Sequence, residues 1–210
     1  MPERFFLYKM TADSGGAPCV EDGVLTLAIC KPAIRSSAVE DDWLFGVGGV
    51  RLGNRLIYIA RVTKKLPDGD YYRQHSRRRD CIYSWNREGT TLKIRQRARY
   101  HTDGKQTERD VGDPPAYSKA NVLLSVGEFR YLGKSGTPID QSRYPDLSGV
   151  LSSLRRGHRV NHDPSVAREL VRLKDEIWAA YPPCFAGEPS QPVPDRDGVC
   201  SCGERRSADD

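Results

Sequence analysis

Three side chains in separate parts of the chain are of types that carry acid–base or nucleophilic chemistry: Asp13, Cys30 and His158. Asp13 lies in a segment of Asp, Ser, Gly and Pro, where its carboxylate either forms a turn or faces a pocket. Cys30 ends an apolar run, where a packed thiol is commoner than a nucleophile. Asp13 and His158 are therefore the candidate catalytic residues, although no particular reaction is indicated.

His158 lies in a short run that contains three arginines. Neighbouring positive charge disfavours the protonated imidazole, so we expect His158 to be neutral at pH 7. A neutral imidazole both donates and accepts hydrogen bonds, as recognition of a base edge requires. The alternative interpretation is an ordinary basic loop.

An anion site is suggested by the turn that follows Cys30. Proline suits the first turn of a helix, so Pro32–Val39 is predicted to be helical. Unpaired amides at the start of that helix would favour an anion, with Lys31 and Arg35 beside them. The same residues also fit a solvated basic turn.

A second cationic pattern spans Thr91–His101. As a strand, this segment would place five side chains on one face, namely Lys93, Arg95, Arg97, Arg99 and His101. Such a face either contacts phosphates or is an exposed edge that charge keeps soluble. The candidate phosphate contacts are Lys93, Arg95, Arg97, Arg99 and Arg156.

The elements that position these residues are predicted from short apolar runs. Strands are expected at Arg4–Met10, Val24–Cys30, Leu44–Gly49, Arg55–Thr63, Cys81–Trp85 and Ala120–Leu132. Leu25–Val62 holds three of these runs and is taken as the core of the fold. A short helix is expected at Leu147–Leu154. A longer helix is expected at Val166–Tyr181, N-capped by Asp163. We predict one domain over residues 1–183 and a disordered tail over 184–210.

Composition limits the class of protein. The 210 residues carry a formal charge of +5, which suits nucleic acid or nucleotides without requiring them. No apolar run approaches the roughly 20 residues of a membrane span, and MPERFFLYKM lacks the layout of a signal peptide. We therefore expect a cytoplasmic protein with no membrane partner, whose six cysteines are free thiols or ligands.

Motifs for cofactors and metals are missing. The glycines after Phe45 do not have dinucleotide-binding spacing, and there is no Walker loop or nucleophile elbow. Cys200 and Cys202, with distant Cys184 and no nearby histidine, make a poor zinc site. We predict neither a metal nor a cofactor.

A set of short motifs points to a family. They are Tyr8-Lys9-Met10, Asp13-Ser14-Gly15, Ala17-Pro18, Leu25-Thr26-Leu27-Ala28, Cys30-Lys31-Pro32 with Ile34-Arg35, Asp42-Trp43, Gly46 with Gly48, Arg55-Leu56-Ile57-Tyr58, Asp80 with Ile82-Tyr83, and Gly157-His158. Over roughly Phe5–Val171 the chain resembles the nucleotide modification associated domain 2 family. Cys81 departs from the family pattern, where a polar residue is expected. The arginine-rich segment and the tail are features of this chain.

The resemblance implies a setting, because the family is associated by gene context with phage and bacterial systems that make or handle modified DNA bases. A weaker similarity of pattern is to PUA-like barrels of the ASCH and EVE type, which hold a base in a pocket. It implies an α+β fold, with a mixed, barrel-like sheet and a C-terminal packing helix.

Three functions remain open. The first is a binding module for a modified nucleobase, in DNA or as a nucleotide, with Trp43, Tyr58 or Tyr83 stacking on the base. Its candidate ligand-binding residues are Asp13, Gly15, Lys31, Pro32, Arg35, Trp43, Gly48, Tyr58, Tyr83 and His158. The second is an enzyme that acts on a modified nucleotide or base, with Asp13 and His158 as acid–base groups. The third is an interaction subunit that binds other proteins of a base-modification or anti-phage complex.

Overall fold

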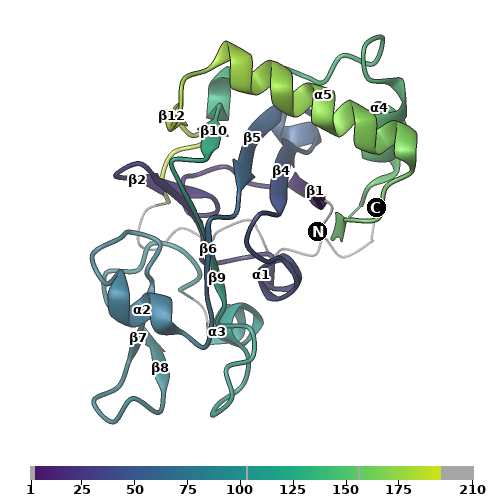
Figure 1. The fold of residues 1–210 in the computed structure, drawn as a ribbon. Helices are drawn as coiled ribbons and strands as arrows, with labels where there is room; N and C mark the ends of the chain where they lie inside the picture. The colour runs from purple at the N-terminus through teal and green to yellow at the C-terminus, as the bar shows by residue number, and fades with distance from the viewer. Residues whose placement is uncertain (1–2, 103, 156, 195–210) are drawn as a thin grey trace, which may run out of the picture.

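Four layers make up the fold in the computed structural model, which describes residues 3–102, 104–155 and 157–194. Two helices cover one face of a six-stranded sheet, a four-stranded sheet covers its other face, and small helices with a hairpin form the fourth layer (Figure 1). Three apolar clusters fill the spaces between these layers.

The six-stranded sheet is mixed and has the order β11-β1-β4-β5-β10-β12. In that order the strands are His158–Arg159, Phe5–Met10, Trp43–Gly48, Leu56–Arg61, Phe129–Tyr131 and Phe185–Ala186. β1 pairs in parallel with β4, and β10 pairs in parallel with β12, while the other neighbours are antiparallel.

The four-stranded sheet is antiparallel, with the order β2-β3-β9-β6. Its strands are Cys19–Glu21, Val24–Leu27, Val122–Val126 and Lys64–Leu66. A separate hairpin pairs β7 (Tyr83–Trp85) with β8 (Leu92–Ile94). The helices are α1 (Pro32–Ser37), α2 (Asp70–Gln74), α3 (Gly104–Val111), α4 (Pro145–Ser153) and α5 (Pro164–Ala180). Two 3₁₀ turns lie at Val50–Leu52 and Gly133–Ser135.

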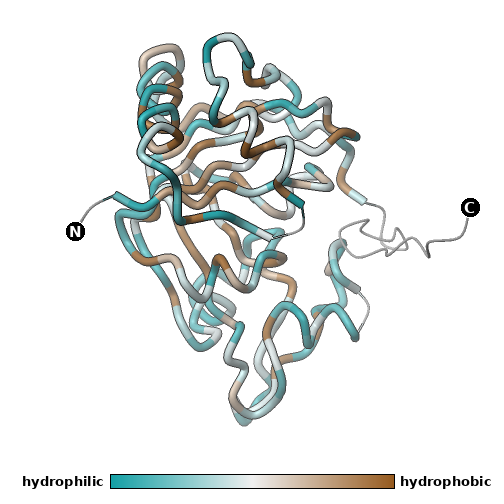
Figure 2. The backbone as a smooth tube through the Cα atoms, turned by 90° about the vertical axis from the view of Figure 1, so that its right-hand side faces the viewer, coloured by the Kyte–Doolittle hydropathy of each residue, from teal (hydrophilic) through white to brown (hydrophobic). Residues whose placement is uncertain are grey.

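Period-two alternation in β1 explains how the first sheet is buried on both faces. Phe5 and Leu7 pack under α4 and α5, whereas Phe6, Tyr8 and Met10 face the second sheet. Many of the segments that consist of hydrophobic residues accordingly run through the middle of the molecule (Figure 2). The fourth layer packs on the far face of the second sheet through an aromatic cluster that includes Tyr71, Tyr72, Tyr83 and Tyr100.

The α+β class is confirmed, but the barrel-like sheet is not. Among the described residues the strands form separate sheets that do not close into a barrel, although β5 leads into β6 and β9 leads into β10 from one sheet to the other. No helix among these residues is both long and apolar enough to cross a membrane.

Two local expectations differ from the structure. The predicted strand over Thr91–His101 is wrong beyond Ile94, because Ala98 closes a turn onto the Arg95 carbonyl and His101 turns into the core. Residues 184–194 were placed in the tail, yet β12 pairs with β10 and the Gln191 amide donates to the Asp13 carbonyl. Residues 195–210, with Cys200 and Cys202, lie outside the described residues, so the disordered tail stays a prediction there.

The packing of α5 on the first sheet can be tested with Leu170→Ala. Leu170 is fully buried in the cluster beneath α5, so we expect the free energy of unfolding to fall by about 2–5 kcal/mol. Urea unfolding followed by circular dichroism measures the change. Val50→Ala is the control, because Val50 is 83% exposed and its truncation should change stability by less than about 0.5 kcal/mol. Equal effects of the two variants would contradict this packing.

Candidate functional site

The turn between β3 and α1 holds two successive non-glycine residues in the left-handed region. Cys30 has φ +58° and Lys31 has φ +45°. Each costs about 1–2 kcal/mol relative to an ordinary conformation, so surrounding contacts must hold the turn in place.

Arg35 supplies much of that hold, and it is fully buried. Its guanidinium donates to four backbone carbonyls, those of Cys30 (2.7 Å), Lys119 (2.8 Å), Asn121 (2.6 Å) and Asp110 (2.7 Å). Arg35 is therefore a structural cation that joins α1 to the chain around α3, and its side chain is not directed at solvent.

The anion beside this turn is the protein's own Asp110. The Cys30 amide donates to Asp110 Oδ1 at 2.9 Å, and Arg35 lies 3.9 Å from the same oxygen. The predicted preference for an anion is thus met by a carboxylate from α3, and Pro32 begins α1 as expected.

His101 completes a connected set of three side chains. His101 Nε2 lies 3.2 Å from Cys30 Sγ, and His101 Nδ1 makes a close hydrogen bond with Asp110 Oδ2. Because an ionised carboxylate only accepts, Nδ1 carries the hydrogen and Nε2 is left as the basic nitrogen facing the sulfur. We call Cys30, His101 and Asp110 the thiol relay.

Electrostatics keep the Asp110 carboxyl ionised. Burial alone would raise its pKa, but the hydrogen bond from His101, helped by Arg35 and the Cys30 amide, lowers the pKa below its ordinary value. Tyr83 also donates to Asp110 Oδ2 at 2.9 Å. Along the relay the burial decreases, since Asp110 and His101 are buried and Cys30 is only half-buried.

Asp13 was expected either to form a turn or to face a pocket, and in the structure its carboxylate oxygens accept hydrogen bonds from the protein. Tyr131 donates to Oδ1 at 2.5 Å, while the amide and hydroxyl of Ser190 donate to Oδ2 at 2.9 and 2.7 Å. Gly15, two residues after Asp13, has φ +78°, and a Cβ added there would lie 3.3 Å from Pro189 and 3.5 Å from Arg79. Asp13 therefore ties the loop before β2 to residues 184–194.

The predicted aromatic residues belong to three different core clusters. Tyr58 lies between the two sheets, Tyr83 lies beneath the second sheet and Trp43 lies under α5. They cannot line one stacking pocket together. Gly48 is also a packing position, because a Cβ there would lie 2.6 Å from the Leu52 Cβ.

Lys31 and His158 do come together beside β1. Lys31 Nζ lies 4.8 Å from the centre of the Tyr8 ring, and His158 is the strand partner of Tyr8. Burial and the charge of Lys31 lower the pKa of His158, which favours the neutral imidazole that was expected. The causes are burial and Lys31 instead of the neighbouring arginines.

The cationic residues after Thr91 divide by their partners. Lys93 is exposed on β8, whereas Arg95 donates to the carbonyls of Tyr83, Ser76 and Tyr72 and so braces the hairpin. Arg97 and Arg99 are exposed and line a cavity. Arg156 lies outside the described residues.

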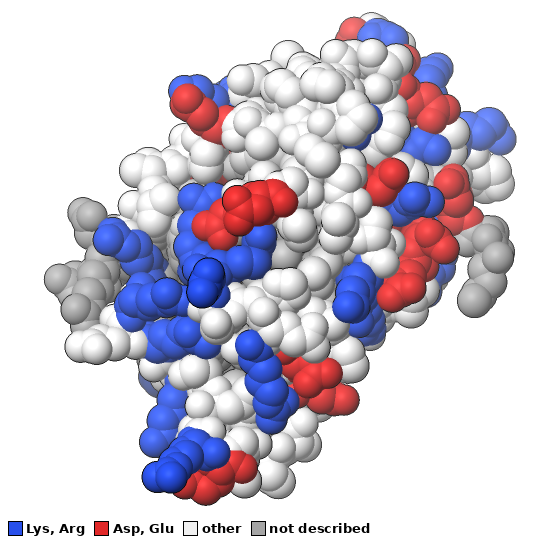
Figure 3. All heavy atoms as spheres, turned by 60° about the vertical axis from the view of Figure 1, so that its left-hand side comes forward, with Lys and Arg blue, Asp and Glu red and all other residues white. Residues whose placement is uncertain are grey.

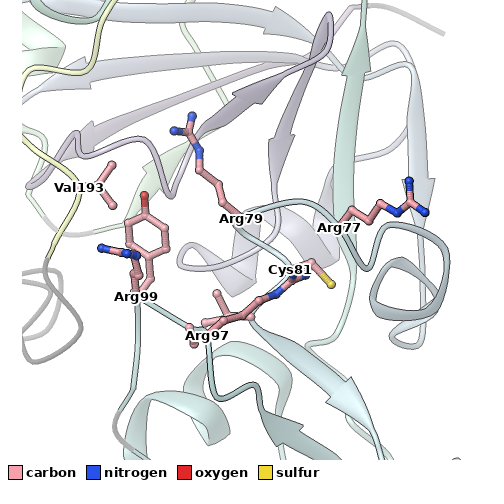
Figure 4. A pocket seen from close by; sticks show the side chains of 9 residues that line it. Arg77, Arg79, Cys81, Arg97, Arg99 and Val193 are labelled. Carbon is pink, nitrogen blue, oxygen red and sulfur yellow. The ribbon is translucent and has the colours of Figure 1, made fainter.

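This cavity has a volume of about 360 Å³ and combines four arginines with an apolar wall. The arginines are Arg77, Arg79, Arg97 and Arg99, and the wall consists of Cys81, Ile82, Ala98, Tyr100 and Val193. We call it the arginine cavity. The side chains reach it from separate segments (Figure 4), and Lys and Arg also gather on the face of the molecule seen in Figure 3.

The four arginines are not equally engaged. Arg79 pairs with Glu21 at 3.3 Å and donates to Cys19 Sγ at 3.4 Å, and Arg97 donates to the Ser76 carbonyl. No acidic partner is found for Arg77 or Arg99 within the part of the chain that the structure describes. These two guanidinium groups therefore retain their capacity to bind an anion.

One cluster of side chains has the residue types of a metal site, but a metal would need its ligand atoms to be free. Donor atoms of Cys19, Glu21 and Asp80 lie within 4.8 Å of one another. Arg79 contacts both Cys19 and Glu21, and Arg78 lies 3.5 Å from Asp80. Burial raises the pKa of Cys19 to about 12. The cluster already contains its cations, and we assign it no metal.

Sequence reasoning missed His101 and Asp110 as partners of Cys30, and Arg77 and Arg79 as cavity residues. His101 was grouped with the cations of the predicted strand, and Asp110 lies in a polar segment that carries no periodic signal. The sequence signal that could have indicated this site is the position of Cys30, at the end of an apolar strand and directly before a Lys-Pro turn.

Comparison with known proteins gives one match. The family model described as nucleotide modification associated domain 2 matches residues 2–193, which is most of the chain. None of the curated proteins and none of the solved structures matches the chain significantly.

The structural role of Asp110 is tested by Asp110→Asn, with exposed Asp113→Asn as the control. Removing this buried charge leaves Arg35 without its anion and removes a charged acceptor from the His101 Nδ1 hydrogen, so we expect a loss of roughly 3–5 kcal/mol at pH 7. Urea unfolding measures the loss.

The pH dependence follows from the lowered pKa of Asp110. Its stabilising contribution is present above the unfolded-state value of about 3.9 and is lost as pH falls toward the lower folded-state value. The difference between wild type and Asp110→Asn should therefore shrink below about pH 5. A difference that grows on acidification would contradict this electrostatic account.

Proposed function

The chain belongs to the nucleotide modification associated domain 2 family, and from that premise we propose that it binds a nucleotide or a single-stranded nucleic acid at the arginine cavity. The observation that carries the proposal is the pairing of guanidinium groups with an apolar wall in one cavity. The family supplies the setting of nucleotide modification, and the cavity suggests how the ligand is held.

Charge supports a phosphate-binding role for the cavity. Guanidinium groups bind phosphate oxygens through paired N–H donors, and they keep their charge at any physiological pH. Arg77 and Arg99 have no acidic partner among the described residues. They are also exposed, so a phosphate can reach them without breaking an existing ion pair.

The wall of the cavity supports a base-binding role. A volume of about 360 Å³ falls at the lower end of the range for small-molecule sites. Ile82, Ala98 and Tyr100 supply an apolar surface for the face of a base. Burial raises the pKa of Cys81 to about 11, so this thiol is neutral at pH 7 and adds to the apolar wall.

Recognition of a modified base is the finer part of the proposal. Trp43, Tyr58 and Tyr83 do not form a common stacking site, so base discrimination is assigned to the wall of the arginine cavity. A modified base that binds more tightly than the plain base would gain its extra contacts from this wall and from Arg79 or Arg97. Association with other base-modification proteins remains compatible with this role.

An enzymatic role is the second candidate. Asp13 and His158 are poorly suited to act together, because the Asp13 carboxylate is engaged by Tyr131 and Ser190, whereas His158 stacks on Phe6. The observation that favours catalysis is the thiol relay, in which a histidine nitrogen lies 3.2 Å from the sulfur of a half-buried cysteine.

The binding proposal is tested with Arg77→Ala and Arg99→Ala. Fluorescence anisotropy of a labelled single-stranded oligonucleotide gives the affinity over a series of salt concentrations. Each substitution should weaken binding and lower the slope of log K against log salt by about 0.7, the value for one lost phosphate contact. Repeating the titration with an oligonucleotide that carries a modified base tests discrimination.

Arg168→Ala is the matched control, since Arg168 is exposed on α5, on the far side of the first sheet. It removes the same charge from a different layer. The arginine cavity is not the binding site if Arg77→Ala and Arg99→Ala bind as tightly as the wild type. The same conclusion follows if they lose no more affinity than Arg168→Ala.

A further inference from the structure

We infer that Cys30, His101 and Asp110 form a catalytic site in which the Cys30 thiol attacks an acyl carbon, in a substrate of the amide or ester class. The inference rests on residues other than those that line the arginine cavity, so it does not depend on the proposed binding function.

The geometry meets the requirements of an activated thiol. A nucleophile and its base must lie within about 2.6–3.2 Å, and a third group must orient the base. Cys30 Sγ and His101 Nε2 are 3.2 Å apart, and Asp110 holds His101 through Nδ1. The three side chains come from the β3–α1 turn, the loop before α3 and α3 itself.

Both reacting groups are held in strained backbone conformations. Cys30 has φ +58° and His101 has φ +48°, a region that residues with a Cβ rarely occupy. The Cys30 peptide is fixed on both sides, since its amide donates to Asp110 and its carbonyl accepts from Arg35. Such over-determination of strained residues is a feature of functional sites.

Exposure distinguishes Cys30 from Cys19 and Cys81, and its side-chain partners distinguish it from Cys184. Cys19 and Cys81 are buried, whereas Cys30 is half-buried, as is Cys184. Cys184 Sγ donates to the Gly23 carbonyl at 3.9 Å, and no hydrogen bond joins it to a histidine or a carboxylate among the described residues. Cys184 is therefore a natural internal control for Cys30.

The proposed reaction has two steps. In the first, His101 Nε2 takes the Cys30 proton as sulfur bonds to the acyl carbon. The bond from that carbon to the leaving nitrogen or oxygen breaks, and the imidazolium returns the proton to the leaving group. In the second step, water attacks the thioester and gives a proton to His101. The carbon–sulfur bond breaks, the sulfur recovers the proton, and a carboxylic acid is released.

Each member of the relay has a distinct role in these steps. Cys30 forms the covalent bond, and His101 moves the proton in both directions. Asp110 keeps Nδ1 protonated, so that Nε2 is the basic nitrogen, and it stabilises the imidazolium when this forms. Tyr83 and Arg35 hold the carboxylate and act as positioning residues.

The test uses p-nitrophenyl acetate as the acyl probe and the full chain with Cys200→Ser and Cys202→Ser. Release of p-nitrophenolate reports acylation, and peptide mass spectrometry locates the acetyl group. We expect an initial burst of one equivalent per chain, acetylation at Cys30 at least about 100-fold faster than at Cys184, and loss of the burst in Cys30→Ala.

The role of His101 is tested with two variants chosen for its backbone. Asparagine and glycine both tolerate the left-handed region, so His101→Asn and His101→Gly remove the base with little added strain. Acetylation of Cys30 should slow by about 10²–10⁴-fold in both. Added imidazole should restore part of the rate in His101→Gly, an effect that a merely structural histidine would not show. Thermal unfolding confirms that each variant is folded.

The comparison of Cys30 with Cys184 is made within one chain, which carries only Cys200→Ser and Cys202→Ser, and it does not depend on how well the Cys30 or His101 variants fold. Acetylation of the two thiols at similar rates would overturn the inference. So would an unchanged rate at Cys30 in folded His101→Asn. Loss of oligonucleotide binding in Arg99→Ala with an intact burst would leave the thiol site standing by itself.

Discussion

The structure around the candidate sites depends on a buried ion pair, Arg35 and Asp110, whose side chains also make many hydrogen bonds to the backbone. Arg35 is fully buried, and Asp110 is 2% exposed. Between them they bind backbone groups from the turn at Cys30, from α3 and from the segment before β9. Burying either charge without the other would be strongly unfavourable. This requirement fixes the fourth layer to the end of the second sheet.

Because of this arrangement, the chemistry of the thiol relay is inseparable from the packing of the fold. The carboxylate that orients His101 is the one that neutralises Arg35, and Tyr83 ties the same carboxylate to the hairpin of β7 and β8. A simple packing network would not need a half-buried thiol at its outer end. Here the network ends at Cys30, in a backbone conformation that its neighbours actively maintain.

Sequence patterns predicted the strands and the long helix more successfully than the site. Alternation in β1 and the apolar stripe of α5 each report burial, which local periodicity encodes. The same alternation could not tell whether Trp43 or Tyr58 lines a pocket or fills a core, because both uses require an apolar face. Asp110 was invisible for a different reason. Its importance comes from contacts with Cys30 and His101, 80 and 9 residues away in the chain.

The arginine cavity and the thiol relay adjoin each other along two segments of the chain. Cys81 and Ile82 line the cavity, and the next residue, Tyr83, donates to Asp110. Tyr100 also lines the cavity, and the residue after it, His101, is the base of the relay. A ligand that moves the backbone at Tyr100 therefore acts on His101 through one peptide unit. The proposed phosphate site and the proposed thiol site are thus neighbours along the backbone, although the two sites share no side chain.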